Sequence, residues 1–146
     1  MLLDSNTFRT VVDSTPLISL DFIITKNEKT LLGRRVNKPA SNYFFSIGGR
    51  VYKNETIECA MKRIIKDEVD VDFHIKPKFI GIFEHFYEDS IFENVSSHYV
   101  NLAYKFEAKD NLDLPLNQHS EYKWISIEDL LNSNEVHDYV KNYFRI

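Results

Sequence analysis

One carboxylate in the segment 57–69 stands where the sequence pattern expects an apolar side chain. Apolar residues recur there three and four positions apart, a spacing that places them on one face of a helix: Ile57, Ala60, Met61, Ile64 and Ile65. Glu68 continues that face. A buried carboxylate is costly unless it is paired or binds a metal ion, and the C-terminal end of a helix is already negative. The pattern predicts a divalent cation beside Glu68; the alternative is a helix that frays before Glu68 and leaves it in solvent.

Two glycines and an arginine lie before this helix, at the end of an expected aromatic strand. Gly48 and Gly49 are followed directly by Arg50. A residue without a side chain lets the backbone approach a ligand closely. A guanidinium can bind phosphate through a fork of two hydrogen bonds. The segment 48–50 therefore indicates a site for a phosphate-bearing ligand near the predicted cation.

The elements that position these residues are strands interspersed with helices. We expect a short helix over 4–12, a helix over 56–69, a helix that begins at Ser126 and a final helix over 134–144. The expected strands are 17–25, 30–35, 43–47, 79–87, 98–108 and 122–125. Several strands follow one another directly, which favours a mixed β-sheet with helices on its faces. The sequence thus predicts an α+β fold, arranged as an α-β-α sandwich, in one domain that spans residues 1–146.

The composition limits the classes of partner. The chain has 146 residues, of which 43% are hydrophobic, enough for one packed core. Its net charge of −4 argues against a nucleic-acid partner, because duplex binding needs a concentrated basic surface. The single cysteine, Cys59, excludes an intrachain disulfide, and we give it no role. We find no membrane-spanning run and no signal-peptide pattern, and therefore expect a cytoplasmic protein that does not bind membranes.

The residues around the helix resemble the signature of a known family, the Nudix hydrolases. That signature is G-x5-E-x7-R-E-U-x-E-E-x-G-U, where U is a bulky aliphatic residue. The spacing is kept over 23 positions, and the matching residues are Gly49, Glu55, Arg63, Ile65, Glu68 and Val71. Asp67 replaces one glutamate, Ile64 replaces another, and Asp70 replaces the second glycine. The loss of a carboxylate argues against the usual attack on phosphorus and favours a branch that uses fewer metal ions.

Other segments resemble such a branch, the GDP-mannose mannosyl hydrolases. The similar segments are STPLISLDFI (14–23), LLGRRVNKPA (31–40), GGRVYKNET (48–56), HFY (85–87), HYV (98–100) and NQHSEYKW (117–124). The resemblance implies hydrolysis of GDP-mannose, or GDP-glucose, at the sugar C1 with inversion. It also implies a homodimer and one Mg²⁺ per active site, with Mn²⁺ as a substitute.

The resemblance assigns the metal ligands and the general base. The Gly48 carbonyl, the Glu68 carboxylate and the Gln118 side-chain oxygen would bind Mg²⁺, which prefers hard oxygen ligands. His119 would take a proton from the attacking water, since much of a histidine is neutral at pH 7. Taken alone, Gln118 and His119 would more often be solvated residues of a loop.

The resemblance also assigns the substrate-binding residues. Arg35 and Arg50 would bind the diphosphate, whereas the neighbouring Arg34 is expected to be a surface residue. Arg63 would either touch phosphate or form an ion pair with Asp67, four residues later.

Three further residues are assigned to the sugar and the leaving group. Asp21 lies in an apolar strand, either on a solvated face or placed to bind the sugar. His85 and Tyr99, on two other strands, would neutralise or orient the leaving group, or they are core residues with a satisfied polar end. Two alternatives remain for the whole protein: an ordinary Nudix pyrophosphatase, which attacks phosphorus, and a non-catalytic module that binds a nucleotide sugar.

Overall fold

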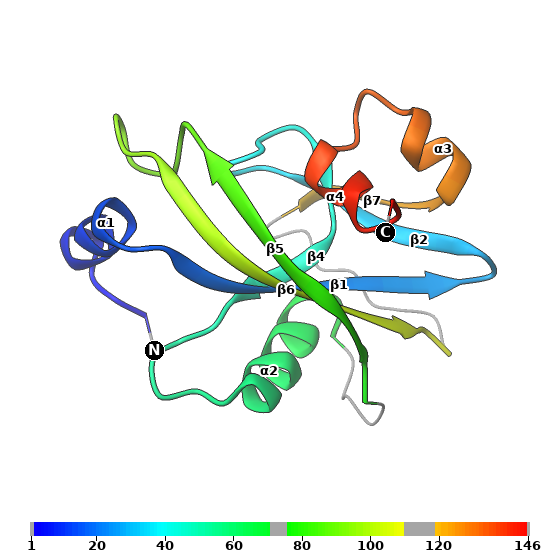
Figure 1. Cartoon of the computed structure of the whole chain (residues 1–146), viewed down its shortest axis with the longest axis horizontal. Coiled ribbons are helices and arrows are strands. Elements are labelled where there is room, and N and C mark those ends of the chain that lie inside the picture. Colours follow the sequence, from blue (N-terminus) through cyan, green and yellow to red (C-terminus); the bar gives the residue numbers. More distant parts are fainter. Residues whose placement is uncertain (1, 71–75, 110–118, 146) are drawn as a thin grey trace.

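The computed structural model of the protein describes residues 2–70, 76–109 and 119–145. Within these ranges four helices and seven strands follow one another (Figure 1). The helices are α1 (Ser5–Ser14), α2 (Ile57–Val69), α3 (Ile127–Asn132) and α4 (Asp138–Asn142). The strands are β1 (Leu17–Lys26), β2 (Lys29–Arg35), β3 (Phe44–Phe45), β4 (Ile47–Arg50), β5 (Lys78–Tyr87), β6 (Ser97–Glu107) and β7 (His119–Ser126).

The strands form one mixed sheet around β1. One edge of β1 pairs in parallel with β6, from Leu17 to Thr25. Its other edge is shared: β4 pairs with its first half and β2 with its last residues, both antiparallel. Beyond these neighbours, β5 pairs with β6, while β3 and β7 pair with β2. The expected mixed sheet is confirmed. Because β2 pairs only with the last residues of β1, the first half of that edge is free to pair with β4.

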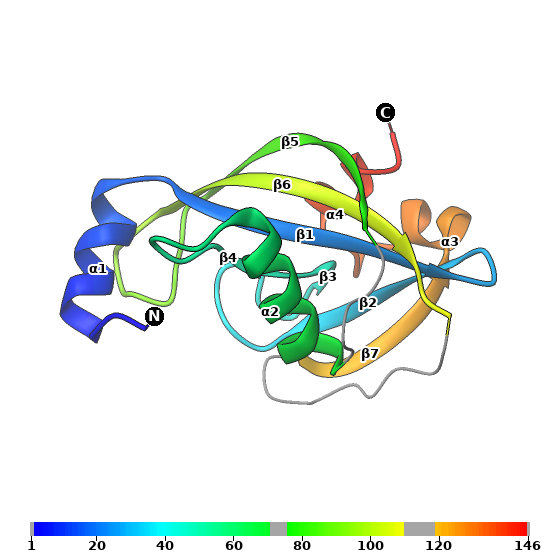
Figure 2. The ribbon, with the colours of Figure 1, turned by 90° about the horizontal axis from the view of Figure 1, so that it is seen from below.

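Helices cover both faces of the sheet. The helix α2 lies across one face (Figure 2), where its apolar stripe packs on the buried side chains of Leu20, Phe22 and Ile24 in β1. The helices α3 and α4 pack at the β2 end, around Leu32 and Phe44. This arrangement confirms the α-β-α sandwich.

Three expected boundaries were wrong. The aromatic strand 43–47 is two strands that are interrupted at Ser46, and both glycines of the pair lie inside β4. The last strand was predicted over 122–125 from its apolar residues. It begins at His119, because the pairing of β7 with β2 continues beyond those residues. The final helix begins at Asp138 instead of residue 134, since Val136 forms a bridge with Phe44.

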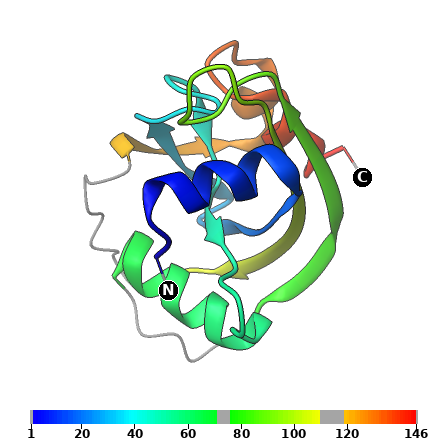
Figure 3. The ribbon, with the colours of Figure 1, turned by 90° about the vertical axis from the view of Figure 1, so that its left-hand side faces the viewer.

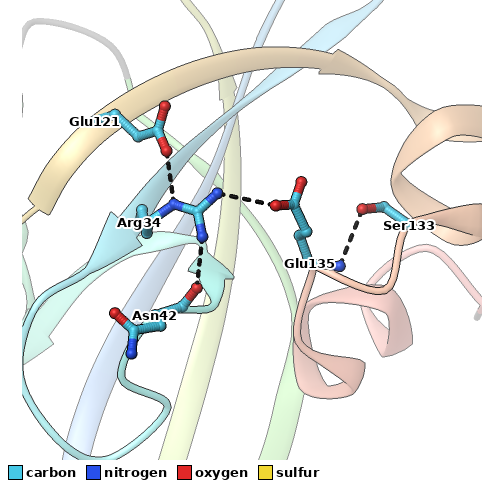
Figure 4. A network of polar contacts seen from close by, with 5 residues as sticks. All are labelled: Arg34, Asn42, Glu121, Ser133 and Glu135. Carbon is cyan, nitrogen blue, oxygen red and sulfur yellow. Dashed lines mark hydrogen bonds and ion pairs between the residues drawn. The ribbon is translucent and has the colours of Figure 1, made fainter.

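Arg34, which we expected to be a simple surface residue, connects three parts of the chain (Figure 4). Its guanidinium binds the carboxylates of Glu121 at 2.6 Å and Glu135 at 3.1 Å, and donates to the Asn42 carbonyl at 3.0 Å. The group also lies 4.4 Å from the centre of the Phe44 ring. Arg34 therefore ties β2 to β7 and to the connection before α4, which explains a charged residue here without any role in binding a ligand.

Across the described ranges, no helix combines the length and the apolar character that crossing a bilayer requires.

Candidate active site

Eight of the ten residues predicted for the site line one cavity of about 590 Å³. They come from six elements of the chain: Asp21, Arg35, Gly48, Arg50, Arg63, Glu68, His85 and Tyr99. Figure 3 views the molecule from the end where α1 lies in front of β4, with α2 below. Gln118 lies outside the described residues, and of His119 only the backbone is described. The fold thus brings together side chains that are up to 78 positions apart, from Asp21 to Tyr99.

The helix that carries Glu68 has the predicted start and end. The Thr56 hydroxyl accepts a hydrogen bond from the Cys59 N–H at 3.1 Å, which caps the first turn. The helix continues to Val69, and Glu68 is only 4% exposed. The alternative of a frayed end with Glu68 in solvent is therefore wrong. A carboxylate lies buried at the wall of the cavity, as the periodicity predicted.

Two departures from the Nudix signature have local explanations. Asp70 ends α2 in the left-handed conformation, with φ 53° and ψ 42°. Glycine adopts this conformation without strain, and aspartate is among the few other residues that tolerate it. Ile64 is 2% exposed and packs under Gly49, so the position of the missing carboxylate belongs to the apolar core.

Gly48 lies directly beside Asp21. The two residues are paired across β4 and β1. A side-chain carbon added at Gly48 would overlap the Oδ1 atom of Asp21 and the Leu20 carbonyl oxygen. The absence of a side chain at Gly48 therefore lets the Asp21 carboxylate lie directly against the backbone of β4.

Asp21 belongs to a buried hydrogen-bond network and not to a solvated face. Its Oδ2 atom accepts hydrogen bonds from the Ser46 hydroxyl at 2.9 Å and the Tyr143 hydroxyl at 2.5 Å. Burial raises the pKa of the Asp21 carboxyl; the hydrogen bonds from Tyr143, Ser46 and Asn101 and the charge of Arg35 oppose this rise. Of the two alternatives for Asp21, the solvated face is excluded.

His85 and Tyr99 face each other on neighbouring strands. They are directly paired in the β5–β6 register. Burial lowers the pKa of His85 to about 4, and the nearby His137 adds to this effect. Burial also raises the pKa of Tyr99. At pH 7 the imidazole is neutral, so His85 is suited to orient a leaving group by hydrogen bonding and not to neutralise its charge.

The guanidinium groups of Arg35 and Arg50 are held by contacts on different sides of the cavity. Arg35 donates through Nε to the Pro39 carbonyl at 2.9 Å. Arg50 lies over the ring of Phe8, with its central carbon 4.5 Å from the ring centre. Such a cation–π contact positions the guanidinium without neutralising its charge. Both side chains are therefore oriented without being neutralised by a carboxylate in the described contacts.

Arg63 has a different partner from the one we expected. It binds Glu55 through two nitrogens, at 2.7 and 2.9 Å, and donates to the Arg50 carbonyl at 2.8 Å. The hydrogen bonds from Arg63 lower the pKa of Glu55 to about 2. Asp67 contributes to Arg63 only as a nearby charge. The predicted i,i+4 pair is therefore wrong: Glu55, brought close by the loop before α2, offers the geometry for a fork and Asp67 does not.

His119 is part of the sheet and not of a loop. It is the first residue of β7, and its backbone pairs with Arg35 of β2. The register of these two strands shifts between Gly33 and Arg35, which marks a β-bulge. The strand pairing thus places the backbone of His119 next to that of a cavity residue, Arg35.

The chain matches the family model of the NUDIX domain over residues 17–144. The protein is a member of the Nudix hydrolase family. It is 40% identical over 115 residues to the low-salt glycan biosynthesis protein Agl8 of Haloferax volcanii, a match that covers 77% of this chain and 72% of Agl8. Its fold is similar to a MutT protein of Methanosarcina mazei (TM-score 0.73, 20% identity, 90% of this chain and 93% of that one) and to a MutT Nudix hydrolase of Burkholderia pseudomallei (TM-score 0.74, 18% identity, 90% and 98%).

Nudix hydrolases typically use a divalent metal ion such as Mg²⁺. In the parts of the chain that the structure describes, no three His, Cys, Asp or Glu side chains group as a metal site. The ligand set suggested by the sequence needs only one carboxylate, because its other members are a backbone carbonyl and an amide. Glu68 and Gly48 line the same cavity, and their oxygens are the hard donors that Mg²⁺ prefers. The described residues therefore fit a Nudix metal ion at this wall.

Several cavity residues of this Nudix hydrolase were missed by the sequence reasoning. Ser46, between β3 and β4, and Asn101, in β6, are buried polar residues flanked by apolar ones, a signal that was present but not used. Phe8 and Tyr52, which flank the Arg50 guanidinium, carried no such signal. Their contribution depends on how α1 and the loop after β4 fold over the sheet.

Proposed function

We propose that the protein hydrolyses a GDP-sugar, with GDP-mannose as the first candidate and GDP-glucose as the second, to GDP and the free sugar. The observation that carries the proposal is the shared cavity: arginines suited to a diphosphate and a buried carboxylate suited to a sugar line one space. Its volume of about 590 Å³ lies within the range of pockets that enclose small ligands. The name of the 40% identical relative, a glycan biosynthesis protein, is consistent with a nucleotide-sugar substrate.

The diphosphate is assigned to Arg35 and Arg50. Two guanidinium groups held in advance reduce the cost of binding and stabilise the charge that develops on the departing GDP. Mg²⁺, or Mn²⁺ in its place, would be held by the Gly48 carbonyl, Glu68 and Gln118 and would supply further stabilisation of that charge. Arg63 uses two of its nitrogens to bind Glu55, so we assign it only a secondary part in binding the phosphates.

The reaction is a single displacement at the sugar C1. His119 takes a proton from water as the water oxygen bonds to C1. The bond from C1 to the β-phosphate oxygen breaks, and its electron pair leaves with GDP. Asp21 accepts a hydrogen bond from a sugar hydroxyl, while His85, neutral at pH 7, and Tyr99 orient the leaving group. One in-line attack inverts the configuration at C1.

Hydrolysis in ¹⁸O-labelled water distinguishes this reaction from that of an ordinary Nudix pyrophosphatase. We expect the label in the free sugar and none in GDP. Label in phosphate would show attack on phosphorus, the reaction of an ordinary Nudix pyrophosphatase. GDP-sugar binding without any product would leave the third alternative, a nucleotide-sugar binding module.

The stereochemistry of the first product tests the mechanism separately. An α-linked GDP-sugar should give the β-anomer first, which proton NMR observes before the anomers equilibrate. The α-anomer as first product would exclude a single displacement.

The variant His119→Gln tests the general base. We expect kcat to fall about 10²- to 10⁴-fold, because the attacking water loses its proton acceptor. The matched control is His98→Gln, since His98 stacks on Phe86 at 4.4 Å and has no part in the proposed reaction. Unchanged turnover of His119→Gln would remove His119 from this role.

We further propose that the protein acts as a homodimer, as its resemblance implies. The exposed Leu2 (83%) is a candidate contact. Phe8, another apolar residue near the N-terminus, packs within its own chain on Phe92, with 5.6 Å between the ring centres. Sedimentation analysis of the wild type and of Leu2→Ser measures the assembly, and a monomer at micromolar concentration would contradict the proposal.

A further inference from the structure

A tyrosine near the C-terminal end of the chain reaches the carboxylate that we assign to the sugar. Tyr143 follows α4 directly and is 3% exposed. Its hydroxyl lies 2.5 Å from Oδ2 of Asp21, a residue 122 positions earlier in the sequence. Nothing in the sequence pattern connects the two residues, so this contact is a product of the fold alone.

The direction of the hydrogen bonds follows from the chemistry of the groups. A tyrosine hydroxyl carries one hydrogen, and Tyr143 donates it to Oδ2 of Asp21. The oxygen of that hydroxyl then accepts from the Asn101 amide at 3.0 Å. Burial raises the pKa of Tyr143 well above its ordinary value, which keeps the donated proton on the tyrosine. The result is a directed chain from Asn101 through Tyr143 to Asp21.

This chain of hydrogen bonds restrains the Asp21 carboxylate. Oδ2 receives hydrogen bonds from Tyr143 and Ser46, and the Asn101 amide is a further donor to the carboxylate. Oδ1 is the atom that lies against Gly48. Two donors on one oxygen restrict rotation of the carboxylate, and an orientation fixed in advance lowers the entropic cost of meeting a substrate.

We propose that Tyr143 is a positioning residue, which holds the Asp21 carboxylate in the orientation that binds the sugar hydroxyl. The inference rests on the proposed function, because it takes the role of Asp21 from there. Tyr143 does not touch the substrate in this account and acts through Asp21, although its hydroxyl also lies 3.4 Å from Nε2 of His85.

The ring of Tyr143 also packs in the core, so its structural and positioning roles must be separated. The ring lies edge-on to Phe83 at 4.8 Å and contacts the buried Ile23 and Ala103. The variant Tyr143→Phe keeps this ring and removes only the hydroxyl. The matched control is Tyr104→Phe, which removes a hydroxyl from a partly buried ring of β6 that packs on Phe22 and is outside the proposed machinery.

A double-mutant cycle tests the inference: the wild type, Tyr143→Phe, Asp21→Asn and the double variant. We expect Tyr143→Phe to lower kcat/KM for GDP-mannose about ten- to a hundredfold, the loss typical of one hydrogen bond to a charged group. In the Asp21→Asn background the same change should have an effect below about twofold, because there is no carboxylate left to position. Tyr104→Phe should leave kcat/KM unchanged.

The outcomes separate this inference from the proposed function. Equal fold-losses from Tyr143→Phe in both backgrounds, or no loss in either, would overturn the positioning role whichever bond is cleaved. Cleavage between the phosphates, with the cycle still non-additive, would refute the proposed function and keep the inference. If the protein binds GDP-mannose without turnover, the same double-mutant cycle can be measured on the Kd by calorimetry. Additive losses of affinity would then overturn the positioning role, and non-additive losses would support it.

Discussion

The buried imidazole of His85 predicts that the protein loses stability on mild acidification. The side chain is 3% exposed, and its ring is stacked on Tyr139 at 4.3 Å with an angle of 6° between the planes. Burial lowers its pKa from 6.5 to about 4 in the folded state. Between these values the unfolded chain binds a proton on this residue that the folded protein does not bind. The free energy of unfolding must therefore fall as the pH falls from about 6.5 towards 4.

The size of the effect follows from the same two values. A pKa difference of one unit corresponds to about 1.4 kcal/mol, so His85 costs about 2 kcal/mol of stability between pH 7 and pH 5. The assay is urea denaturation at pH 7, 6 and 5, followed by the fluorescence of Trp124, the only tryptophan. The difference between the wild type and His85→Gln isolates this residue from the other groups that titrate in the same range.

Between pH 7 and pH 5 the free energy of unfolding should fall by about 2 kcal/mol less in His85→Gln than in the wild type. Equal losses for the wild type and His85→Gln would refute the reasoning, because His85 would then accept a proton in the folded protein. A charged His85 would also contradict its role as a neutral hydrogen-bonding group in the proposed reaction.

Three further predictions follow from the local geometry. Gly48→Ala should lower the free energy of unfolding by about 1–3 kcal/mol and reduce activity, because the added methyl group overlaps the Asp21 carboxylate; urea denaturation and steady-state kinetics measure both effects. Glu55→Gln should cost about 1–2 kcal/mol at pH 7, and the difference from the wild type should shrink only as the pH falls below about 4, since Arg63 holds the pKa of Glu55 near 2. Asp70→Gly should raise the thermal midpoint by a few degrees, corresponding to about 1 kcal/mol or less, because glycine adopts φ 53° without strain; a lower midpoint would contradict this explanation.

The helix α2 illustrates how far local sequence information reaches. Its extent, its apolar spacing and the inward position of Glu68 were all predicted, because the pattern of a helix is set by residues three and four positions apart. Arg63 marks the limit of such reasoning. A partner four residues away was the natural expectation, but the loop before the helix brings Glu55 into a better geometry.

Strands were easier to locate than to pair. Alternating and continuous apolar runs located β1, β5 and β6 to within a residue or two. Their partners were not predictable, because pairing depends on segments far apart in the sequence. The extension of β7 to His119 is an example: its first residues are polar, and only the ladder with β2 makes them a strand.

The sequence by itself determined the family, the mixed sheet with its helices, and the types of group available for the chemistry, because motif spacing and hydrophobic periodicity are local properties of the chain. Only the tertiary structure decided that Asp21 lies buried between Gly48 and Tyr143, and that His85 is neutral. These properties depend on burial and on contacts across up to 122 residues, which no local pattern encodes.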